Sequence, residues 1–217
     1  MPKKIIVLTA ETPNNFEILE PLFRKFSGNV RAVFVDDVPA ERFGKNLKRV
    51  MKFGLPRIPK ALLARLAVIL SGRQKSIARI CAQKGVAVHM IKDMNSPETV
   101  ALLRRLAPDL VVCAGFNQIL KKDALSVCPV INLHRSLLPK FGNSFPVHRA
   151  LAANENETGV TIHFMSEKVD SGKIIARARV KIVKKDSVES IYEKTSAVGG
   201  TLLLETVEKL LRRKKYV

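Results

Sequence analysis

The chain has 217 residues, 47% of them hydrophobic, and a formal net charge of +19. This length and composition suit one large globular domain with a buried core and exclude a disordered chain. No apolar run approaches the roughly 20 residues that span a bilayer, and residues Met1 to Lys4 lead into a strand pattern without a signal-peptide core. We therefore expect a cytoplasmic protein, and its positive charge predicts an anionic partner.

The cysteines give no sign of a disulfide framework or a metal centre. Cys81, Cys113 and Cys128 are odd in number, lie in or beside apolar stretches and lack the spacing of metal ligands. We expect three buried thiols and no metal.

The beginning of the chain predicts a strand, a helix and a second strand. Ile5 to Ala10 is an apolar run typical of a buried strand, Asn15 to Phe26 repeats apolar residues at helical spacing, and Val30 to Val35 is a second apolar run. This order indicates parallel strands joined by a crossover helix.

The segment from Glu41 to Ile80 is strongly basic, with eleven Lys or Arg residues and one acidic residue. Apolar and cationic residues alternate in it, and Pro56 and Pro59 interrupt the pattern, which predicts a helical insertion at about residues 41–80 built from broken amphipathic helices. Such an insertion could hold an anionic acceptor, an RNA or an anionic membrane surface, or it could be a solvated face. The sequence leaves these alternatives open, as it does the oligomeric state.

The rest of the chain continues the alternation of strands and helices. The expected elements are strands at Val86–Met90, Leu110–Ala114, Val130–Leu133, Thr161–Phe164 and Ile174–Ile182, and helices that begin at Ser96 and run from about Ser187 to Arg212. This pattern predicts an α/β fold with a mostly parallel, twisted sheet and helices on both faces. No linker or repeat divides it, so we expect a single domain over residues 1–217.

Three segments place polar residues where such a fold binds ligands. The strand Leu110–Ala114 is followed by Gly115, Phe116 and Asn117, a tight turn at the carboxyl edge of the sheet whose backbone can face a flat heterocycle. Asn132 and His134 lie two residues apart on a strand and therefore point the same way. An amide and an imidazole side by side can stabilise the oxyanion that forms when an amine attacks a carbonyl group.

The third segment runs from Thr158 to Ile175 and places Asp170 in a turn between two strands. The combined pattern is Asn-x-His, Ser-Leu-Leu-Pro, Thr-Gly-Val-Thr-x-His and Asp-x-Gly, in this order, within residues 107–180. It resembles the catalytic domain of the 10-formyltetrahydrofolate-dependent formyltransferases, which include the glycinamide ribonucleotide, methionyl-tRNA and sugar N-formyltransferases.

This resemblance implies a Rossmann-like formyltransferase fold, 10-formyltetrahydrofolate as the formyl donor, and a role for each site residue. Asn132 and His134 would donate hydrogen bonds to the oxyanion, and Asp170 would hold His134 and a water and assist removal of the proton. The acceptor would lie near Gly115, Phe116, Asn117 and Arg135. The pterin would lie against Gln118, Ile119 and Leu120, with Met165, Ser166, Glu167 and Lys168 closing over it and His163 nearby. For His163, a hydrogen bond that holds this loop is an equal alternative.

The acceptor itself is predicted from departures from the family pattern. Glycinamide ribonucleotide formyltransferases carry a Gly-rich phosphate loop after the first strand, whereas this chain has Glu11 and Pro13 there, which argues against that substrate. Methionyl-tRNA formyltransferases carry a further C-terminal domain, and this sequence ends after one helix, although +19 would suit RNA. Arg135, which replaces a Pro or small residue after the catalytic His, would suit an anionic small molecule.

We therefore expect a nucleotide-linked amino sugar as the acceptor, with methionyl-tRNA and glycinamide ribonucleotide as alternatives. A formyltetrahydrofolate hydrolase, in which water replaces the amine, is a further alternative, although such enzymes carry an N-terminal regulatory domain. A nucleic-acid-binding protein on an inactive scaffold would have a broken set of catalytic residues, and here the set is intact.

Overall fold

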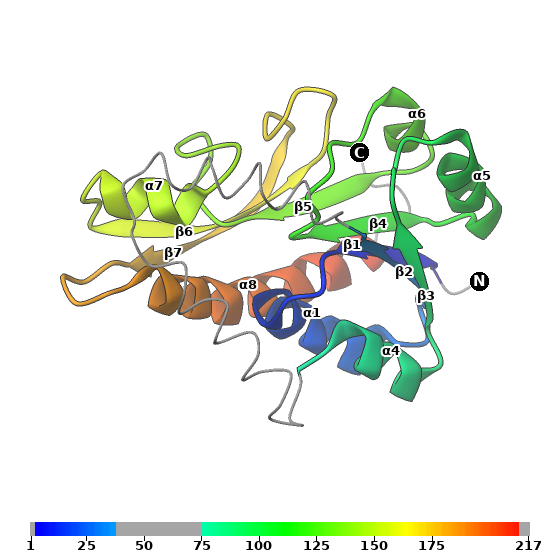
Figure 1. The fold of residues 1–217 in the computed structure, drawn as a ribbon, viewed down its shortest axis with the longest axis horizontal. Helices are drawn as coiled ribbons and strands as arrows, with labels where there is room; N and C mark the ends of the chain where they lie inside the picture. The colour runs from blue at the N-terminus through cyan, green and yellow to red at the C-terminus, as the bar shows by residue number, and fades with distance from the viewer. Residues whose placement is uncertain (1–2, 38–74, 213–217) are drawn as a thin grey trace.

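The computed structural model describes residues 3–37 and 75–212, which form a seven-stranded sheet flanked by helices (Figure 1). The strands are β1 (Ile5–Thr9), β2 (Val30–Asp36), β3 (Ala87–Ile91), β4 (Leu110–Ala114), β5 (Val130–His134), β6 (Glu157–Phe164) and β7 (Ile174–Lys181). The helices are α1 (Pro13–Phe26), α4 (Ile77–Lys84), α5 (Pro97–Leu106), α6 (Lys122–Leu125), α7 (Pro146–Ala152) and α8 (Val188–Leu211).

The sheet has the strand order β3-β2-β1-β4-β5-β6-β7. The first five strands in this order pair in parallel, and β6 and β7 add two antiparallel pairs at one end. This confirms the predicted α/β fold with a mostly parallel sheet. The carboxyl ends of β1, β4 and β5 consequently meet at one edge, where open α/β sheets bind ligands.

Helices cover both faces of the sheet, as the sequence predicts. One apolar cluster packs α1, α4 and α8 against residues such as Val7, Val112 and Leu133. A second cluster packs α5 and α6 against Leu8, Val111 and their neighbours. In Figure 1, α1, α4 and α8 lie on one side of the strands and α5 and α6 on the other.

Four of the helices begin with side-chain caps that the sequence signals. Thr12, Ser76, Ser96 and Ser187 each precede a helix, and each accepts a hydrogen bond from the backbone N–H three residues later. Such a cap stabilises a helix by about 1 kcal/mol because it satisfies one of the free amide groups of the first turn.

The structure corrects two sequence-based boundaries. The strand predicted to start at Thr161 begins at Glu157. Gly159 lies in this strand, and a Cβ there would lie 2.2 Å from the carbonyl oxygen of Ala178 on β7, so the close pairing requires Gly. The last residues of the predicted insertion, from Ile77 onwards, form α4, a helix of the core rather than an added element. Residues 41–74 of that insertion lie outside the described residues. No helix in the described ranges is long and apolar enough to cross a membrane.

Candidate active site

The predicted catalytic residues Asn132 and His134 lie on β5, at the carboxyl edge of the parallel strands. β5 pairs with β6 in antiparallel register, which sets Asn132 opposite His163 and His134 opposite Thr161. Asp170 lies in the turn between β6 and β7. The structure thus brings side chains from three segments of the chain to one end of β5.

Four side chains at this place are linked in a row by three contacts. Asn132 Nδ2 is 3.2 Å from His163 Nε2, which is 3.5 Å from Asp170 Oδ1. Asp170 Oδ2 is in turn 3.4 Å from Nδ1 of His134, two residues beyond Asn132 on β5. The prediction that Asn132, His134 and Asp170 converge therefore agrees with this geometry, whereas the sequence analysis placed His163 near the folate loop and not between them.

The hydrogen bonds of His163 fix the orientation of the Asn132 amide. Nδ1 of His163 is 2.9 Å from the carbonyl oxygen of Phe164, so this nitrogen carries a hydrogen and donates it. Nε2 of the same ring lies between Nδ2 of Asn132, at 3.2 Å, and Oδ1 of Asp170, at 3.5 Å. An amide nitrogen has two hydrogens, so Asn132 retains one that it can donate to a ligand.

His134 is 9% exposed, and both of its ring nitrogens face acceptors. Nε2 lies 3.0 Å from the carbonyl oxygen of Phe141, and Nδ1 faces the carboxylate of Asp170. Burial lowers the pKa of His134 and outweighs the opposite effects of Asp170 and of the Phe141 carbonyl. The ring is therefore neutral near pH 7 and can donate one hydrogen bond, which in this structure is directed to Phe141.

Asp170 is held by its backbone and by three partners. Its φ of +51° is in the left-handed region, and two residues later a Cβ on Gly172 would lie 1.8 Å from the Phe164 carbonyl oxygen. This explains the Asp-x-Gly pattern physically, because only Gly fits at the third position. Burial alone would raise the pKa of Asp170, but the hydrogen bond with His163, the charge that His134 carries when it is protonated, and the bond from the Asn143 N–H at 2.7 Å together lower it. The carboxylate is therefore ionised at neutral pH.

The Ser-Leu-Leu-Pro segment after β5 is fastened to β6 by a buried hydroxyl group. Oγ1 of Thr161 donates to the carbonyl of Ser136 at 2.6 Å and accepts from the N–H of Leu138 at 3.1 Å. Oγ of Ser136 donates to the carbonyl of Lys140 at 2.7 Å. These bonds hold the loop whose Phe141 carbonyl contacts His134.

The residues predicted to face the pterin differ in how much of their side chain is available. The amide of Gln118 is used inside the protein: Nε2 donates to Oδ1 of Asp36 at 2.7 Å, and Oε1 accepts from the N–H of Met94. Leu120 is buried in the core, whereas Ile119 is 63% exposed. Gln118 and Leu120 can therefore face a ligand through their backbone, and Ile119 through its side chain.

The opposite loop, residues 165–169, is mostly open to solvent. Ser166, Glu167 and Lys168 are exposed, Val169 is 40% exposed, and Met165 is partly buried against the second apolar cluster. Oγ of Ser166 donates to the carbonyl of Lys168 at 3.0 Å, which closes the turn on itself. Each of the two loops assigned to the pterin thus presents an exposed apolar side chain.

Two of the four residues predicted near the acceptor, Gly115 and Arg135, contact Asn15, which sequence reasoning missed. Gly115 has a φ of +69°, and a Cβ there would lie 2.3 Å from the Asn15 amide, so the turn requires Gly. Nδ2 of Asn15 donates to the carbonyls of Ala10 and Gly115, and its Oδ1 accepts from Nη2 of Arg135 at 3.3 Å. Arg135 therefore points toward α1, not outward. The N–H of Asn117 donates to Asp36 at 3.2 Å, and Phe116 packs on the second apolar cluster.

The loop after β1 does not present Glu11 to a ligand, as the sequence argument assumed. Its carboxylate accepts from the N–H groups of Ile77 at 2.7 Å and Ala78 at 3.1 Å, at the N-terminus of α4. The acidic side chain is thus a cap for a neighbouring helix.

Comparison with known protein families shows which family the chain belongs to. The family model described as formyl transferase matches residues 3–207. This chain belongs to the formyl transferase family. Among curated relatives, a methionyl-tRNA formyltransferase of Enterococcus faecalis is 39% identical over 148 residues, which cover 64% of this chain and 47% of the relative. A methionyl-tRNA formyltransferase of Limosilactobacillus fermentum is 37% identical over 141 residues, which cover 64% of this chain and 45% of the relative. The chain thus spans just under half the length of these relatives.

Solved structures show the same fold for this formyl transferase family member. Phosphoribosylglycinamide formyltransferase from Bacillus halodurans matches with a TM-score of 0.72 and 22% identity over 99% of this chain and 98% of that one. A formyltetrahydrofolate deformylase from Pseudomonas syringae matches with a TM-score of 0.70 and 18% identity over 97% of this chain and 62% of that one. At this identity the likeness concerns the fold alone.

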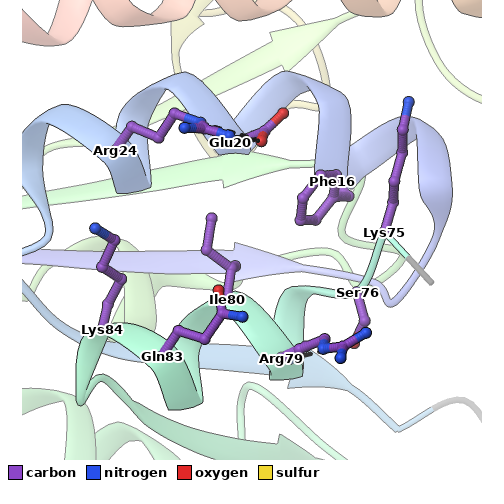
Figure 2. Close-up of a pocket in the computed structure, with 9 residues that line it drawn as sticks. All are labelled: Phe16, Glu20, Arg24, Lys75, Ser76, Arg79, Ile80, Gln83 and Lys84. Carbon is purple, nitrogen blue, oxygen red and sulfur yellow. Dashed lines mark hydrogen bonds and ion pairs between the residues drawn. The ribbon is translucent and has the colours of Figure 1, made fainter. Parts of the chain in front are cut away.

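A pocket of about 420 Å³ in this family member lies between α1 and α4, and none of the four linked side chains lines it. Figure 2 shows Phe16 and Ile80 between the two helices, with cationic side chains around them. Two of these cations are paired, Arg24 with Glu20 and Lys75 with Glu17. None of the predicted catalytic or folate-binding residues lines this pocket. In residues 3–37 and 75–212, no group of three or more His, Cys, Asp or Glu could hold a metal ion.

Proposed function

We propose that this chain transfers the formyl group of 10-formyltetrahydrofolate to an amine. The supporting observation is the row of three contacts that links Asn132, His163, Asp170 and His134, which sets two hydrogen-bond donors and an ionised carboxylate at the ligand-binding edge of the sheet. Those are the groups that an attack of an amine on a formyl carbon requires.

In the proposed reaction, the lone pair of a neutral amine forms a bond to the formyl carbon, and the π electrons of the formyl group move to its oxygen. The free amide hydrogen of Asn132 donates to this oxyanion. His134 donates the second hydrogen bond with its Nε2–H, once this group leaves the carbonyl of Phe141. Each such donor contributes about 3 kcal/mol to lowering the barrier.

Asp170 accepts the proton that the attacking nitrogen loses, directly or through a water. Because the low pKa of this carboxyl group makes it a weak base, the proton moves on rather than staying. The intermediate collapses when the bond between the formyl carbon and N10 of the folate breaks, and N10 takes up the proton. The products are the formylated amine and tetrahydrofolate.

We further propose that the pterin binds between the loop at residues 118–120 and the loop at residues 165–169. The exposed side chains of Ile119 and Val169, one on each loop, support this placement, since a flat heterocycle buries apolar surface on both sides. The backbone groups of Gln118 and Leu120 would supply the polar contacts.

The acceptor amine is a separate part of the proposal. The nucleotide-linked amino sugar expected from the sequence gains no support from the relatives named above, which are methionyl-tRNA formyltransferases. They favour the alternative, so we place methionyl-tRNA first, ahead of glycinamide ribonucleotide and amino-sugar nucleotides. All three acceptors carry phosphate, which suits the charge of +19.

An acceptor panel tests this proposal. The purified chain is incubated with 10-formyltetrahydrofolate and methionyl-tRNA, glycinamide ribonucleotide or an amino-sugar nucleotide, and release of tetrahydrofolate is followed. We expect release that depends on one of these amines and that Asp170→Asn abolishes. Release at the same rate without any amine would identify a hydrolase instead, and no release with any acceptor would contradict formyl transfer.

A further inference from the structure

Arg135 carries a charge that no carboxylate among the described residues neutralises. Its Nη2 donates to Oδ1 of Asn15 at 3.3 Å and to Oγ of Ser196 at 3.4 Å, and its guanidinium lies 5.2 Å from the centre of the Tyr192 ring. These partners are uncharged, and Nε is buried without an acceptor. A guanidinium has five N–H donors, so most of its hydrogen-bonding capacity is unused.

The surroundings of Arg135 increase the positive potential. Asn15 belongs to the first turn of α1, whose N-terminus carries partial positive charge and holds no acidic residue. The acidic residues nearest to Asn15 along the chain are both engaged: Glu11 is bonded to the N-terminus of α4, and Glu17 is paired with Lys75. The sequence outside the described residues holds one acidic side chain, Glu41. A half-buried cation without a counter-ion destabilises a fold, which indicates that an anion is missing here.

A second buried polar atom without a partner lies against the same aromatic ring. The ring of His148 is 6.0 Å from that of Tyr192, and Nδ1 of His148 is buried and makes no hydrogen bond with a described residue. Burial lowers the pKa of His148, against the opposite effect of Glu189, so its ring is neutral near pH 7. Arg135 and His148 thus flank Tyr192 with unused hydrogen-bonding atoms.

The position of Arg135 separates it from the loops proposed for the folate. Side chains alternate along β5, so Asn132 and His134 share the face of Val130, which carries the second apolar cluster. Leu120 and Met165, from the loops proposed for the pterin, belong to that same cluster. Arg135 instead contacts α1 and α8 on the other face. It nevertheless acts on His134, whose pKa its charge lowers.

We propose that Arg135 binds a phosphate group of the acceptor and is a specificity residue of this chain. The inference rests on the proposed function in one respect, namely that the phosphate belongs to the molecule that accepts the formyl group. Phosphate binding at Arg135 does not itself depend on the reaction. A guanidinium fork beside a helix N-terminus is suited to phosphate oxygens, which can accept from several N–H groups at once. The phosphate could belong to a nucleotide or to the backbone of a tRNA.

The first experiment observes the Arg135 Nε–H directly. The full chain labelled with ¹⁵N is titrated with inorganic phosphate, and the arginine Nε–H signals are followed, with Arg135→Lys used for assignment. We expect the Arg135 signal to shift saturably and to be absent from the spectrum of the variant. Arg79→Gln, in the pocket between α1 and α4, is the matched control and should leave the titration unchanged. An unmoved Arg135 signal, or equal saturation with acetate, would overturn the assignment to phosphate.

The second experiment measures steady-state formylation with the acceptor that the panel identifies. Arg135→Gln should raise the KM for this acceptor by about tenfold to a hundredfold, as expected for the loss of a charge-assisted contact, with kcat and folate affinity unchanged within about twofold. The KM of Arg135→Lys should lie between those of the wild type and Arg135→Gln. Circular dichroism checks that the variants are folded. An unchanged KM would overturn the role of Arg135 in acceptor binding. If phosphate binds at Arg135 and no acceptor is formylated, the proposed function fails and the phosphate site stands.

A comparison of a mononucleotide acceptor with methionyl-tRNA identifies the source of the phosphate. A KM effect of Arg135→Gln that is confined to tRNA indicates its backbone, and an effect that is confined to the nucleotide indicates the small molecule.

Discussion

His134 and Arg135 are neighbours in the sequence, but their side chains meet opposite environments. Both nitrogens of His134 face acceptors, and its partner Asp170 is bonded in turn to His163 and Asn143. Arg135 lies among uncharged groups and has a buried nitrogen without an acceptor. The first environment holds groups in fixed positions, which chemistry requires, while the second leaves donors available, which recognition requires. We expect this contrast between the linked side chains of the proposed catalytic network and the unpaired donors of Arg135 to appear in the properties of variants.

The largest effect is expected at the catalytic network. His134→Ala or Asp170→Asn should lower kcat for formyl transfer by at least about a hundredfold, because each removes a group that acts in the chemical step. Circular dichroism should show an intact fold for both variants. Near-normal turnover in either variant would contradict the assignment.

A smaller loss of kcat is expected when His163, which links Asn132 to Asp170, is removed. His163→Ala should lower kcat by about tenfold or more, because Asn132 and Asp170 lose the group that orients them. The KM for the acceptor should hardly change, since the contacts of His163 are with Asn132, Phe164 and Asp170 and not with the residues predicted near the acceptor. The outcome that counts against this positioning role is a change in KM alone.

The unpaired charge of Arg135 should affect the free energy of unfolding. Replacing Arg135 by Met in phosphate-free buffer should raise the free energy of unfolding by about 1 kcal/mol, because it removes an unpaired, half-buried charge. Addition of phosphate should stabilise the wild type and not the variant. Denaturant unfolding with and without phosphate measures both effects, and a destabilised Arg135→Met variant would show that the charge is already satisfied.

The smallest effect concerns the pH dependence of stability. The folded-state pKa of His134 is lowered, so its contribution to stability is present above the unfolded pKa of about 6.5 and is lost as pH falls toward the folded value. The wild type should therefore lose more stability between pH 7.5 and pH 5.5 than His134→Gln does. His148 behaves in the same way and should be replaced in both proteins for the comparison. Identical losses in the two proteins would contradict a buried, neutral His134.

Much of the fold follows from local patterns in the sequence. The predicted strand Leu110–Ala114 coincides with β4, and the predicted last helix differs from α8 by one residue at each end. These elements have a strong apolar pattern or a side-chain cap, both of which are local signals. The helix α7 has neither: it is seven residues long, and Phe145 before it is in the left-handed conformation without a capping bond. The sequence analysis accordingly missed it.

Sequence patterns named the residues proposed for the site but not the contacts among them. The Asn-x-His and Asp-x-Gly patterns indicated Asn132, His134 and Asp170, yet the role of His163 depends on the antiparallel register of β5 and β6, which no local pattern specifies. The contact between Arg135 and Asn15 joins residues 120 positions apart and likewise has no local signal. Long-range pairing of this kind is a property of the packed fold.

The most direct test of the account is a crystal structure with 5-formyltetrahydrofolate, a stable analogue of the formyl donor. We predict the pterin between residues 118–120 and 165–169, and the formyl oxygen within about 3 Å of both Asn132 Nδ2 and His134 Nε2, with the bond from His134 to Phe141 broken. A folate bound elsewhere, such as in the pocket between α1 and α4, or a formyl group far from His134, would contradict the account.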